Sequence, residues 1–180
     1  MDTARVHLAI ERITESICSE FFSGGVITPV AFLGIQIGGV PLARRIAGLI
    51  EQRFSYRAPL GMLDIAMYRD DIGTRKTLPV IHETVIDFDL NNREVILVDD
   101  ILQTGRSIRA ALDAITDYGR PSCIRLAVLV DRGMREFPIR PDYVGELLEA
   151  PANERMNAEW SEYQQQDAVY AVPRKESNNR

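Results

Sequence analysis

Two neighbouring carboxylates, Asp99 and Asp100, follow an apolar run in the segment 95–107, and a turn that contains Thr104 and Gly105 comes directly after them. If a helix starts at this turn, its free N–H groups and the positive end of its dipole suit a phosphate. Carboxylates beside a phosphate are understandable when they bind something in between, such as sugar hydroxyls or a divalent cation. The segment therefore predicts a sugar phosphate site, with the phosphate on the turn and a ribose diol on the two acids.

A simpler interpretation is that Asp99 and Thr104 only cap the following helix. Response regulators also place acidic residues at the ends of strands. An isolated Asp-Asp pair after a strand would favour the capping interpretation. The complete string, in which an apolar strand and Asp-Asp are followed by Gln-Thr-Gly-Arg-Ser and a helix, is more specific and favours a ligand site.

The elements that must position these residues alternate between strand and helix patterns. The patterns predict helices over 4–22, 40–54 and 105–118, strands over 29–33, 60–69, 94–99, 124–131 and 168–172, and a long polar loop over 70–83. This alternation is typical of βαβ units around a parallel sheet, in which ligands bind beyond the carboxyl ends of the strands. In the polar region near the C-terminus, we expect Trp160 and Tyr163 to be packing residues.

The bulk properties favour one cytoplasmic domain. The 180 residues suggest a single domain over 1–173, with a disordered tail over 174–180. No apolar run reaches the roughly 18 residues that a membrane-spanning helix needs, and two cysteines are too few for a disulfide framework. The net charge of −5 argues against indiscriminate binding of nucleic acid. We therefore expect a cytoplasmic protein with no membrane partner.

Four stretches of the sequence resemble the PyrR family of type I phosphoribosyltransferases, whose members are pyrimidine operon regulators and uracil phosphoribosyltransferases. These stretches are 63–71 (LDIAMYRDD), 95–107 (VILVDDILQTGRS), 118–122 (YGRPS) and 126–139, which contains LAVLVDRG and REFPI. The likeness runs from Val30 to Gly145. It implies an α/β protein with the type I phosphoribosyltransferase fold, a central, mostly parallel sheet flanked by helices with a small hood.

The resemblance also implies that the sugar phosphate is phosphoribosyl pyrophosphate (PRPP). Asp99, Asp100 and Arg69 would be the catalytic residues, with the two acids on the ribose hydroxyls. The segment that binds PRPP would continue from the acids around the 5′-phosphate. Its members would be Val98, Asp99, Asp100, Ile101, Leu102, Gln103, Thr104, Gly105, Arg106 and Ser107.

Two further subsites follow from the same resemblance. A turn after the first strand, together with Arg69, would bind the pyrophosphate, and the loop 70–83 would close over the site. The end of the strand 124–131 would approach the base. The pyrophosphate turn would be Gln36, Ile37, Gly38 and Gly39, and the base contacts would be Val130, Asp131 and Arg132.

The implied reaction is displacement of pyrophosphate from PRPP by uracil, which gives UMP. Mg²⁺ would arrive bound to PRPP, so we expect no metal that the protein fixes by itself. The resemblance further implies a homodimer or homotetramer. It also implies binding of a pyrimidine-operon leader RNA through a basic surface, formed by Arg120, Arg125, Arg135 and Arg140.

Two positions depart from the family pattern. Many members have Thr-Arg-Gly in the pyrophosphate turn, where this chain has Ile37, Gly38 and Gly39. Members often have His after the Asp-Arg-Gly element, where this chain has Met134. Two alternatives therefore stay open: a catalytically weak regulator of the same fold that senses PRPP or nucleotides, and a phosphoribosyltransferase for another base, such as a purine.

Overall fold

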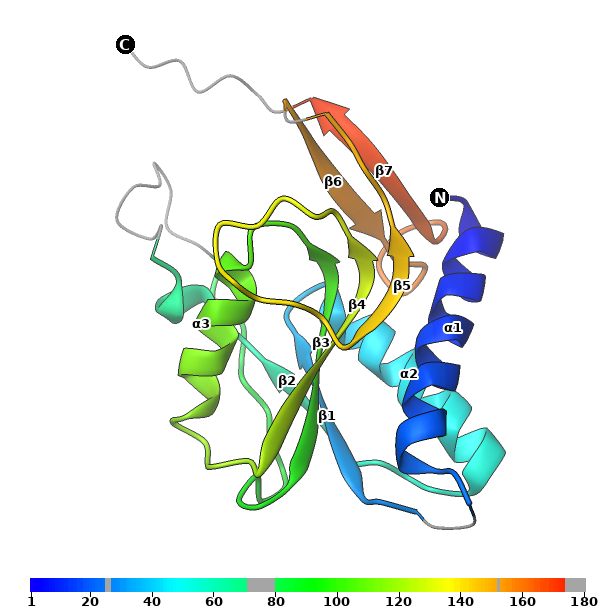
Figure 1. The fold of residues 1–180 in the computed structure, drawn as a ribbon. Helices are drawn as coiled ribbons and strands as arrows, with labels where there is room; N and C mark the ends of the chain where they lie inside the picture. The colour runs from blue at the N-terminus through cyan, green and yellow to red at the C-terminus, as the bar shows by residue number, and fades with distance from the viewer. Residues whose placement is uncertain (25–26, 71–79, 152, 174–180) are drawn as a thin grey trace.

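The computed structural model describes residues 1–24, 27–70, 80–151 and 153–173. Within them, five strands form a wholly parallel sheet in the order β2-β1-β3-β4-β5 (Figure 1). The expected α/β class and central parallel sheet are confirmed. The strands are β1 (Val30–Ile35), β2 (Leu60–Leu63), β3 (Glu94–Leu102), β4 (Cys123–Asp131) and β5 (Tyr143–Leu147).

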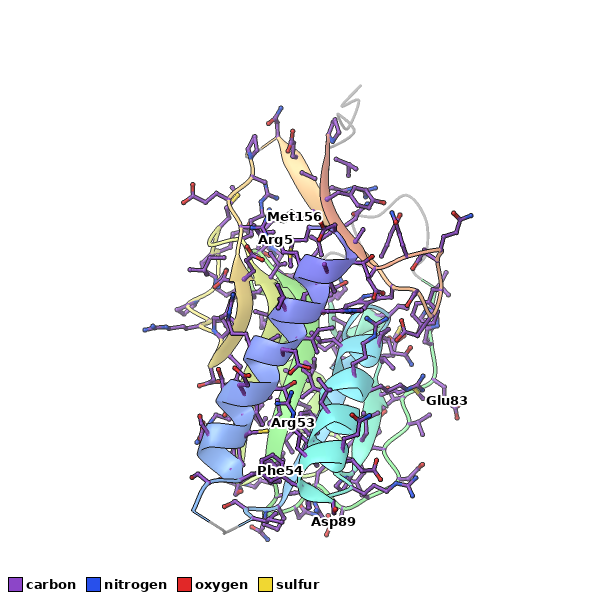
Figure 2. The ribbon with its side chains drawn as sticks, turned by 90° about the vertical axis from the view of Figure 1, so that its right-hand side faces the viewer. Arg5, Arg53, Phe54, Glu83, Asp89 and Met156 are labelled. Atoms are coloured by element: carbon purple, nitrogen blue, oxygen red, sulfur yellow. The ribbon has the colours of Figure 1, made fainter. Side chains whose placement is uncertain are left out.

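Helices cover both faces of this sheet. α1 (Thr3–Phe21) and α2 (Gly39–Phe54) lie on one face, and α3 (Arg106–Ile115) lies on the other (Figure 1). Figure 2 shows α1 and α2 side by side, where Arg53 of α2 pairs with Glu11 of α1. The central strands are therefore buried on both faces, which explains why β1 is apolar and buried along its whole length.

The register of the strands brings their carboxyl ends to one edge of the sheet. Gly34 of β1 pairs with Val98 of β3, and Leu102 of β3 pairs with Asp131 of β4. In an open parallel sheet, the loops that follow such ends form the ligand-binding crevice. The turn after β1, the acids of β3 and the start of α3 accordingly meet at this edge.

An antiparallel hairpin forms a small hood beyond this edge. It pairs β6 (Glu154–Glu159) with β7 (Ala168–Pro173), and Figure 1 shows it above the carboxyl ends of the main sheet. Trp160, directly after β6, is 2% exposed, and the guanidinium carbon of Arg45 lies 5.0 Å from its ring centre. The packing expected of Trp160 is confirmed. The same expectation for Tyr163 is wrong, because this residue is 52% exposed.

The buried carboxylate of Asp167 ties the hood to the helices. Both of its oxygens accept hydrogen bonds of 2.8 Å from the Arg45 guanidinium of α2, and one also accepts the N–H of Ser161. His7 of α1 lies 3.1 Å from the other oxygen. Asp167 thereby joins α1, α2 and the loop between β6 and β7 in one polar cluster.

The structure corrects the strand predicted over 60–69. β2 ends at Leu63, and a 3-10 turn, η1 (Ala66–Tyr68), follows shortly after it. The cause is Asp64, whose Oδ1 accepts the N–H of Ala66 at 2.6 Å and so turns the chain away from the sheet. Most of the predicted polar loop, residues 71–79, and the predicted tail 174–180 lie outside the described residues.

Three other elements differ from the prediction. The helix expected over 105–118 ends at Ile115, because the next N–H groups bond three residues back and tighten the chain into a turn. β5 and β6 were not predicted, since β5 has five residues and β6 reads Glu-Arg-Met-Asn-Ala-Glu, without an apolar run. The late strand expected over 168–172 is confirmed as β7.

Candidate functional site

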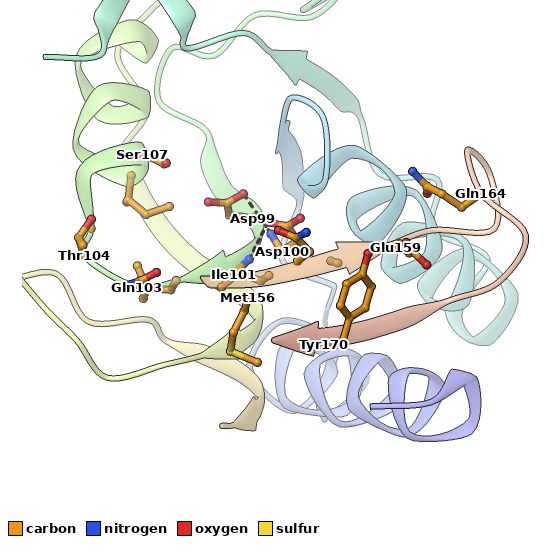
Figure 3. A pocket seen from close by; sticks show the side chains of 15 residues that line it. Asp99, Asp100, Ile101, Gln103, Thr104, Ser107, Met156, Glu159, Gln164 and Tyr170 are labelled. Carbon is orange, nitrogen blue, oxygen red and sulfur yellow. Dashed lines mark hydrogen bonds between the residues drawn. The ribbon is translucent and has the colours of Figure 1, made fainter. Parts of the chain in front are cut away.

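Asp99 and Asp100 lie near the carboxyl end of β3, inside the strand. Asp99 is 8% exposed and Asp100 is half-buried. Asp99 Oδ1 accepts the N–H of Asp100 at 3.0 Å, and Asp100 Oδ1 accepts the N–H of Ile101 at 2.7 Å. Figure 3 shows the two carboxylates at the centre of the cavity, between the start of α3 and the hood. The sequence prediction that these acids reach the ligand edge of the sheet is thus matched by their position.

Burial disfavours the charged forms of both acids. Burial raises the pKa of Asp99 well above its usual range, the nearby Asp100 carboxylate raises it further, and Arg69 opposes the shift. Burial also raises the pKa of Asp100. Without a partner, the pair therefore favours a shared proton. Sugar hydroxyls or a cation in contact with these oxygens would stabilise the charged forms.

The turn between β3 and α3 is held in an open shape by backbone contacts. Gly105, the N-cap of α3, has φ +89°, a left-handed conformation that glycine adopts without strain. The carbonyl of Thr104 accepts the N–H groups of Glu136 and Phe137 at 3.0 Å each. Arg135 donates to the carbonyl of Gln103 at 3.0 Å. Thr104 Oγ1 accepts the N–H of Arg106 at 3.3 Å. Gln103, Thr104, Gly105 and Ser107 line the cavity beside the start of α3, which is where an anion site would lie.

A cavity of about 490 Å³ lies between this turn and the hood. Figure 3 shows Tyr170 of β7 on the far side, and its hydroxyl donates a 2.6 Å hydrogen bond to Glu159 of β6. The cavity joins the predicted PRPP segment to a set of hood side chains that the sequence prediction missed. The lining from the turn is Asp99, Asp100, Ile101, Leu102, Gln103, Thr104, Gly105, Ser107 and Ile108, and the lining from the hood is Met156, Asn157, Ala158, Glu159, Gln164 and Tyr170.

A second cavity, of about 420 Å³, lies on the other side of the same two acids. It brings together the turn after β1 (Gln36, Ile37 and Gly38), Arg69, and Ser107 of α3. Arg69 Nη1 donates to Ser107 Oγ at 3.0 Å, so the arginine side chain lies beside the N-terminal end of α3. Four of the five predicted pyrophosphate residues, Gln36, Ile37, Gly38 and Arg69, are thereby gathered in one place. Asp64 and His82, which the prediction did not include in the site, also line this cavity.

Some predicted site residues do not reach either cavity. Val98 and Gly39 are buried against each other, and a Cβ on Gly39 would overlap the carbonyl oxygen of Val98. Arg106 turns outward, where it donates to Asp70 at 2.5 Å and to Glu136 at 2.7 Å. These residues shape the site without facing it.

The predicted base contacts Val130, Asp131 and Arg132 also lie outside both cavities. Arg132 is 3% exposed, and its guanidinium donates to the carbonyls of Ala150, Pro151 and Glu154. Its Nη1 and Nη2 groups are directed into the segment that leads to the hood. Residues of the hood, and none of these three, line the first cavity. A signal for them in the sequence is weak, because β6 is polar and short.

Two arginines of the implied RNA surface are paired within the chain. Arg125 donates to Glu20 at 2.7 and 3.0 Å, and Arg135 pairs with Asp131 at 2.6 Å. Arg140 lines a shallow pocket at the end of β5. The local positive field expected from this group is therefore reduced by neighbouring carboxylates.

The described residues set limits on metals and membranes. They contain no group of three or more His, Cys, Asp or Glu side chains that could hold a metal ion. No described helix is long and apolar enough to span a bilayer. The neighbouring carboxylates do fit a Mg²⁺ ion that is carried by a phosphorylated ligand, because Mg²⁺ prefers oxygen ligands and is commonly held by one or two carboxylates together with substrate phosphates.

Comparison with known proteins places this chain in a family. The model of the phosphoribosyl transferase domain matches residues 3–163. The "Bifunctional protein PyrR" of Roseiflexus sp. strain RS-1 is 51% identical over 87% of this chain and 84% of its own length. The protein of the same name from Herpetosiphon aurantiacus is 44% identical over 96% of this chain and 95% of its own length. The chain belongs to the PyrR family of phosphoribosyl transferases.

Two solved phosphoribosyltransferase structures share the fold of this chain at low identity. The hypoxanthine phosphoribosyltransferase of Trypanosoma cruzi has a TM-score of 0.70, with 13% identity over 97% of this chain and 95% of its own. The purine phosphoribosyltransferase of Pyrococcus horikoshii has a TM-score of 0.62, with 23% identity over 83% of this chain and 86% of its own. The phosphoribosyltransferase fold inferred from the sequence is therefore confirmed. The family resemblance is confirmed by the family model and the PyrR relatives.

Proposed function

We propose that this chain transfers the phosphoribosyl group of PRPP to uracil, giving UMP and pyrophosphate, and that it couples this reaction to the control of pyrimidine genes. The proposal is supported by the high identity to proteins named bifunctional PyrR over most of the chain. The observation that carries the chemistry is the position of Asp99 and Asp100 between two cavities. One cavity faces the hood and the other faces the turn after β1.

The two cavities suggest how PRPP is divided over the site. We assign the 5′-phosphate to the N–H groups and hydroxyls at the turn of Thr104 and Ser107. The ribose hydroxyls lie on Asp99 and Asp100, whose raised pKa falls again when hydroxyl donors reach them. The pyrophosphate extends into the second cavity toward Arg69, and uracil enters the first cavity against the hood.

Catalysis in this arrangement is mainly positioning and charge stabilisation. The bond between C1 of ribose and pyrophosphate breaks as a uracil nitrogen attacks C1, with loss of the proton on that nitrogen. Positive charge develops on the ribose ring, close to the carboxylates of Asp99 and Asp100. Mg²⁺ that arrives with PRPP supplies neutralising charge to the leaving group. The residues of this chain hold the three parts of the substrate in line.

Product formation tests this proposal directly. The protein is incubated with PRPP and Mg²⁺ and with uracil, hypoxanthine, guanine or orotate, and the nucleotides are separated by chromatography. We expect UMP from uracil and little product from the other bases, and we expect Asp100→Asn to abolish it. A purine nucleotide as the main product would favour the alternative base. The absence of any nucleotide over a wide pH range would reject the enzyme.

A second candidate, a regulator with little turnover, is favoured by the pyrophosphate turn. Ile37, Gly38 and Gly39 carry no side chain that can pair with a phosphate. This candidate predicts tight, turnover-free binding of UMP or PRPP in calorimetry, and UMP-dependent retention of a pyrimidine leader transcript on a filter. Because Arg125 and Arg135 are paired with carboxylates, we expect that RNA affinity to be modest and to fall steeply with salt. No retention with UMP present would count against the RNA function.

The setting of the proposed function follows from its substrates. We propose that the protein acts in the cytoplasm, where PRPP and nascent transcripts are found. We further propose a homodimer or homotetramer, which light scattering after size-exclusion chromatography measures directly.

A further inference from the structure

We propose that His82 binds the pyrophosphate of PRPP and takes the place of the cationic side chain that the turn after β1 lacks. This inference rests on the proposed phosphoribosyl transfer. It adds a ligand-binding residue that neither the PRPP motif nor the predicted pyrophosphate turn contains. Its basis is the small number of cationic side chains in the second cavity, the fixed position of residue 82, and an imidazole with no hydrogen bond to the residues that the structure describes.

The second cavity offers few cationic side chains to an anion. Three carboxylates line it, from Asp64, Asp99 and Asp100, while Ile37 and Gly38 of the turn offer only backbone groups. Among the described residues that line this cavity, only Arg69 and His82 have side chains that can carry positive charge. A pyrophosphate carries several negative charges, so a single arginine leaves much of its charge without a protein partner.

The backbone at residue 82 is fixed against this cavity from two directions. The N–H of His82 donates a 2.6 Å hydrogen bond to Oδ2 of Asp64, which is 9% exposed. The amide of Gln36 in the turn donates to the carbonyl of Glu83 at 2.8 Å. These bonds join residues 82 and 83 to the turn and to the end of β2. His82 therefore lines the cavity from a defined place, close to the residues assigned to pyrophosphate.

The imidazole of His82 is available for a ligand. It forms no hydrogen bond or ion pair with any residue that the structure describes. The carboxylate of Asp64, which holds the backbone of residue 82 in place, accepts hydrogen bonds from the backbone N–H groups of Ala66 and His82. A neutral imidazole donates one hydrogen bond and a protonated one donates two. His82 therefore has the chemistry that the turn lacks.

Two variants at position 82 test the inference, with Ile81→Ala as the matched control. Ile81 is 62% exposed and is not part of the cavity lining. Initial rates are measured with varied PRPP and with varied uracil, and Mg²⁺-pyrophosphate binding is measured by calorimetry. We expect His82→Ala to raise the KM for PRPP and the Kd for pyrophosphate by about tenfold, the usual effect of one hydrogen bond to a charged group. The KM for uracil should not change. His82→Gln should recover part of the affinity, since its amide N–H still donates.

Each outcome separates this inference from the proposed function. An unchanged KM for PRPP and unchanged pyrophosphate binding in His82→Ala would overturn the role of His82, while UMP formation by the unmodified chain would leave the proposed function intact. If the unmodified chain makes no UMP but pyrophosphate binding falls in His82→Ala and is partly restored in His82→Gln, the inference stands and the enzyme is rejected. An equal loss in Ile81→Ala would assign the effect to the local backbone and overturn the inference.

Discussion

Gly38 lies directly against the carboxylate of Asp100: a Cβ on Gly38 would overlap Oδ2 and Cγ of that side chain. The turn after β1 and the second acid of β3 therefore share one space. The lack of a side chain at position 38 is what lets Asp100 take its place between the two cavities. The turn and the acidic pair form one unit, although more than sixty residues of sequence separate them.

Gly38→Ala should weaken PRPP binding with little loss of stability. The backbone of Gly38 has φ −72°, which alanine adopts freely, and the atom it would meet belongs to a side chain that can rotate. The new methyl group should push the Asp100 carboxylate away from the ribose. We expect a PRPP Kd at least tenfold higher in calorimetry and a melting temperature close to that of the unmodified protein. Unchanged affinity would show that Asp100 keeps its function after it moves.

Gly39→Ala provides the contrasting case at the next position. A Cβ there would overlap the carbonyl oxygen of Val98, which belongs to the backbone of the central strand and cannot rotate away. The start of α2 would have to separate from β3. We expect a loss of about 2 kcal/mol in the free energy of unfolding, typical of overpacking in a core. Chemical denaturation measures it, and a loss no larger than that of Gly38→Ala would contradict this view of the contact.

Asp99→Asn should raise stability and lower function. Because burial and the Asp100 carboxylate raise the pKa of Asp99, the folded state binds that proton more tightly than the unfolded state does. The stabilisation is complete below the ordinary carboxyl pKa and is lost as pH rises through the raised one. The asparagine variant escapes this loss, so its unliganded form should melt at a higher temperature than the unmodified protein at pH 7. Its PRPP affinity should fall at least tenfold. A lower melting temperature at pH 7 would contradict the assignment.

Asp167→Asn should act in the opposite direction, away from the substrate. The Arg45 guanidinium lowers the pKa of Asp167, so its stabilisation is present above the ordinary carboxyl pKa and is lost as pH falls through the lowered one. Removing the charge leaves Arg45 without its buried partner and should cost about 3 kcal/mol at pH 7. The difference from the unmodified protein should shrink in strong acid. Denaturation at several pH values tests the trend, and a difference that is constant with pH would refute it.

Arg132→Met should mainly destabilise the protein, and it should weaken binding of the base only as a consequence. The guanidinium satisfies backbone carbonyls of Ala150, Pro151 and Glu154, and their loss should cost roughly 2 kcal/mol. The segment that enters the hood would loosen, and the KM for uracil would rise as a secondary effect. A raised KM for uracil at unchanged stability would instead restore the direct base contact that the sequence suggested.

The sequence was sufficient to select the residues that we propose for the phosphate and the ribose. Asp99, Asp100 and Thr104 are close in sequence, and the strand-to-helix junction that contains them has strong local signals in the apolar run and Gly105. The junction fixes their geometry almost without help from the rest of the chain. The family resemblance was also evident in this segment, because the residues proposed for the phosphate site are consecutive in the sequence.

The hood half of the site was not predictable in the same way. Glu159 and Tyr170 line the same cavity as Asp99 because the hairpin of β6 and β7 folds over the sheet. β6 has no marked apolar pattern, and the apolar pattern of β7 predicts a strand without indicating where that strand packs. Arg132 looked like a ligand residue because it follows a strand end, but its partners lie in the chain leading into β6. His82 was visible in the sequence, yet only the hydrogen bond from its N–H to Asp64 places it by the cavity.

The separation of the hood from the main sheet bears on how this protein can be re-engineered. β6 and β7 pair with each other and supply no strand to the five-stranded sheet. Met156, Asn157 and Tyr170 can therefore be exchanged without breaking a central hydrogen-bond ladder. A library of variants restricted to these positions could be tested with other nucleobases, while the residues proposed to contact the sugar phosphate stayed unchanged. Selectivity for the base could then be changed by substitutions in the hairpin alone, while the five-stranded sheet stayed the same.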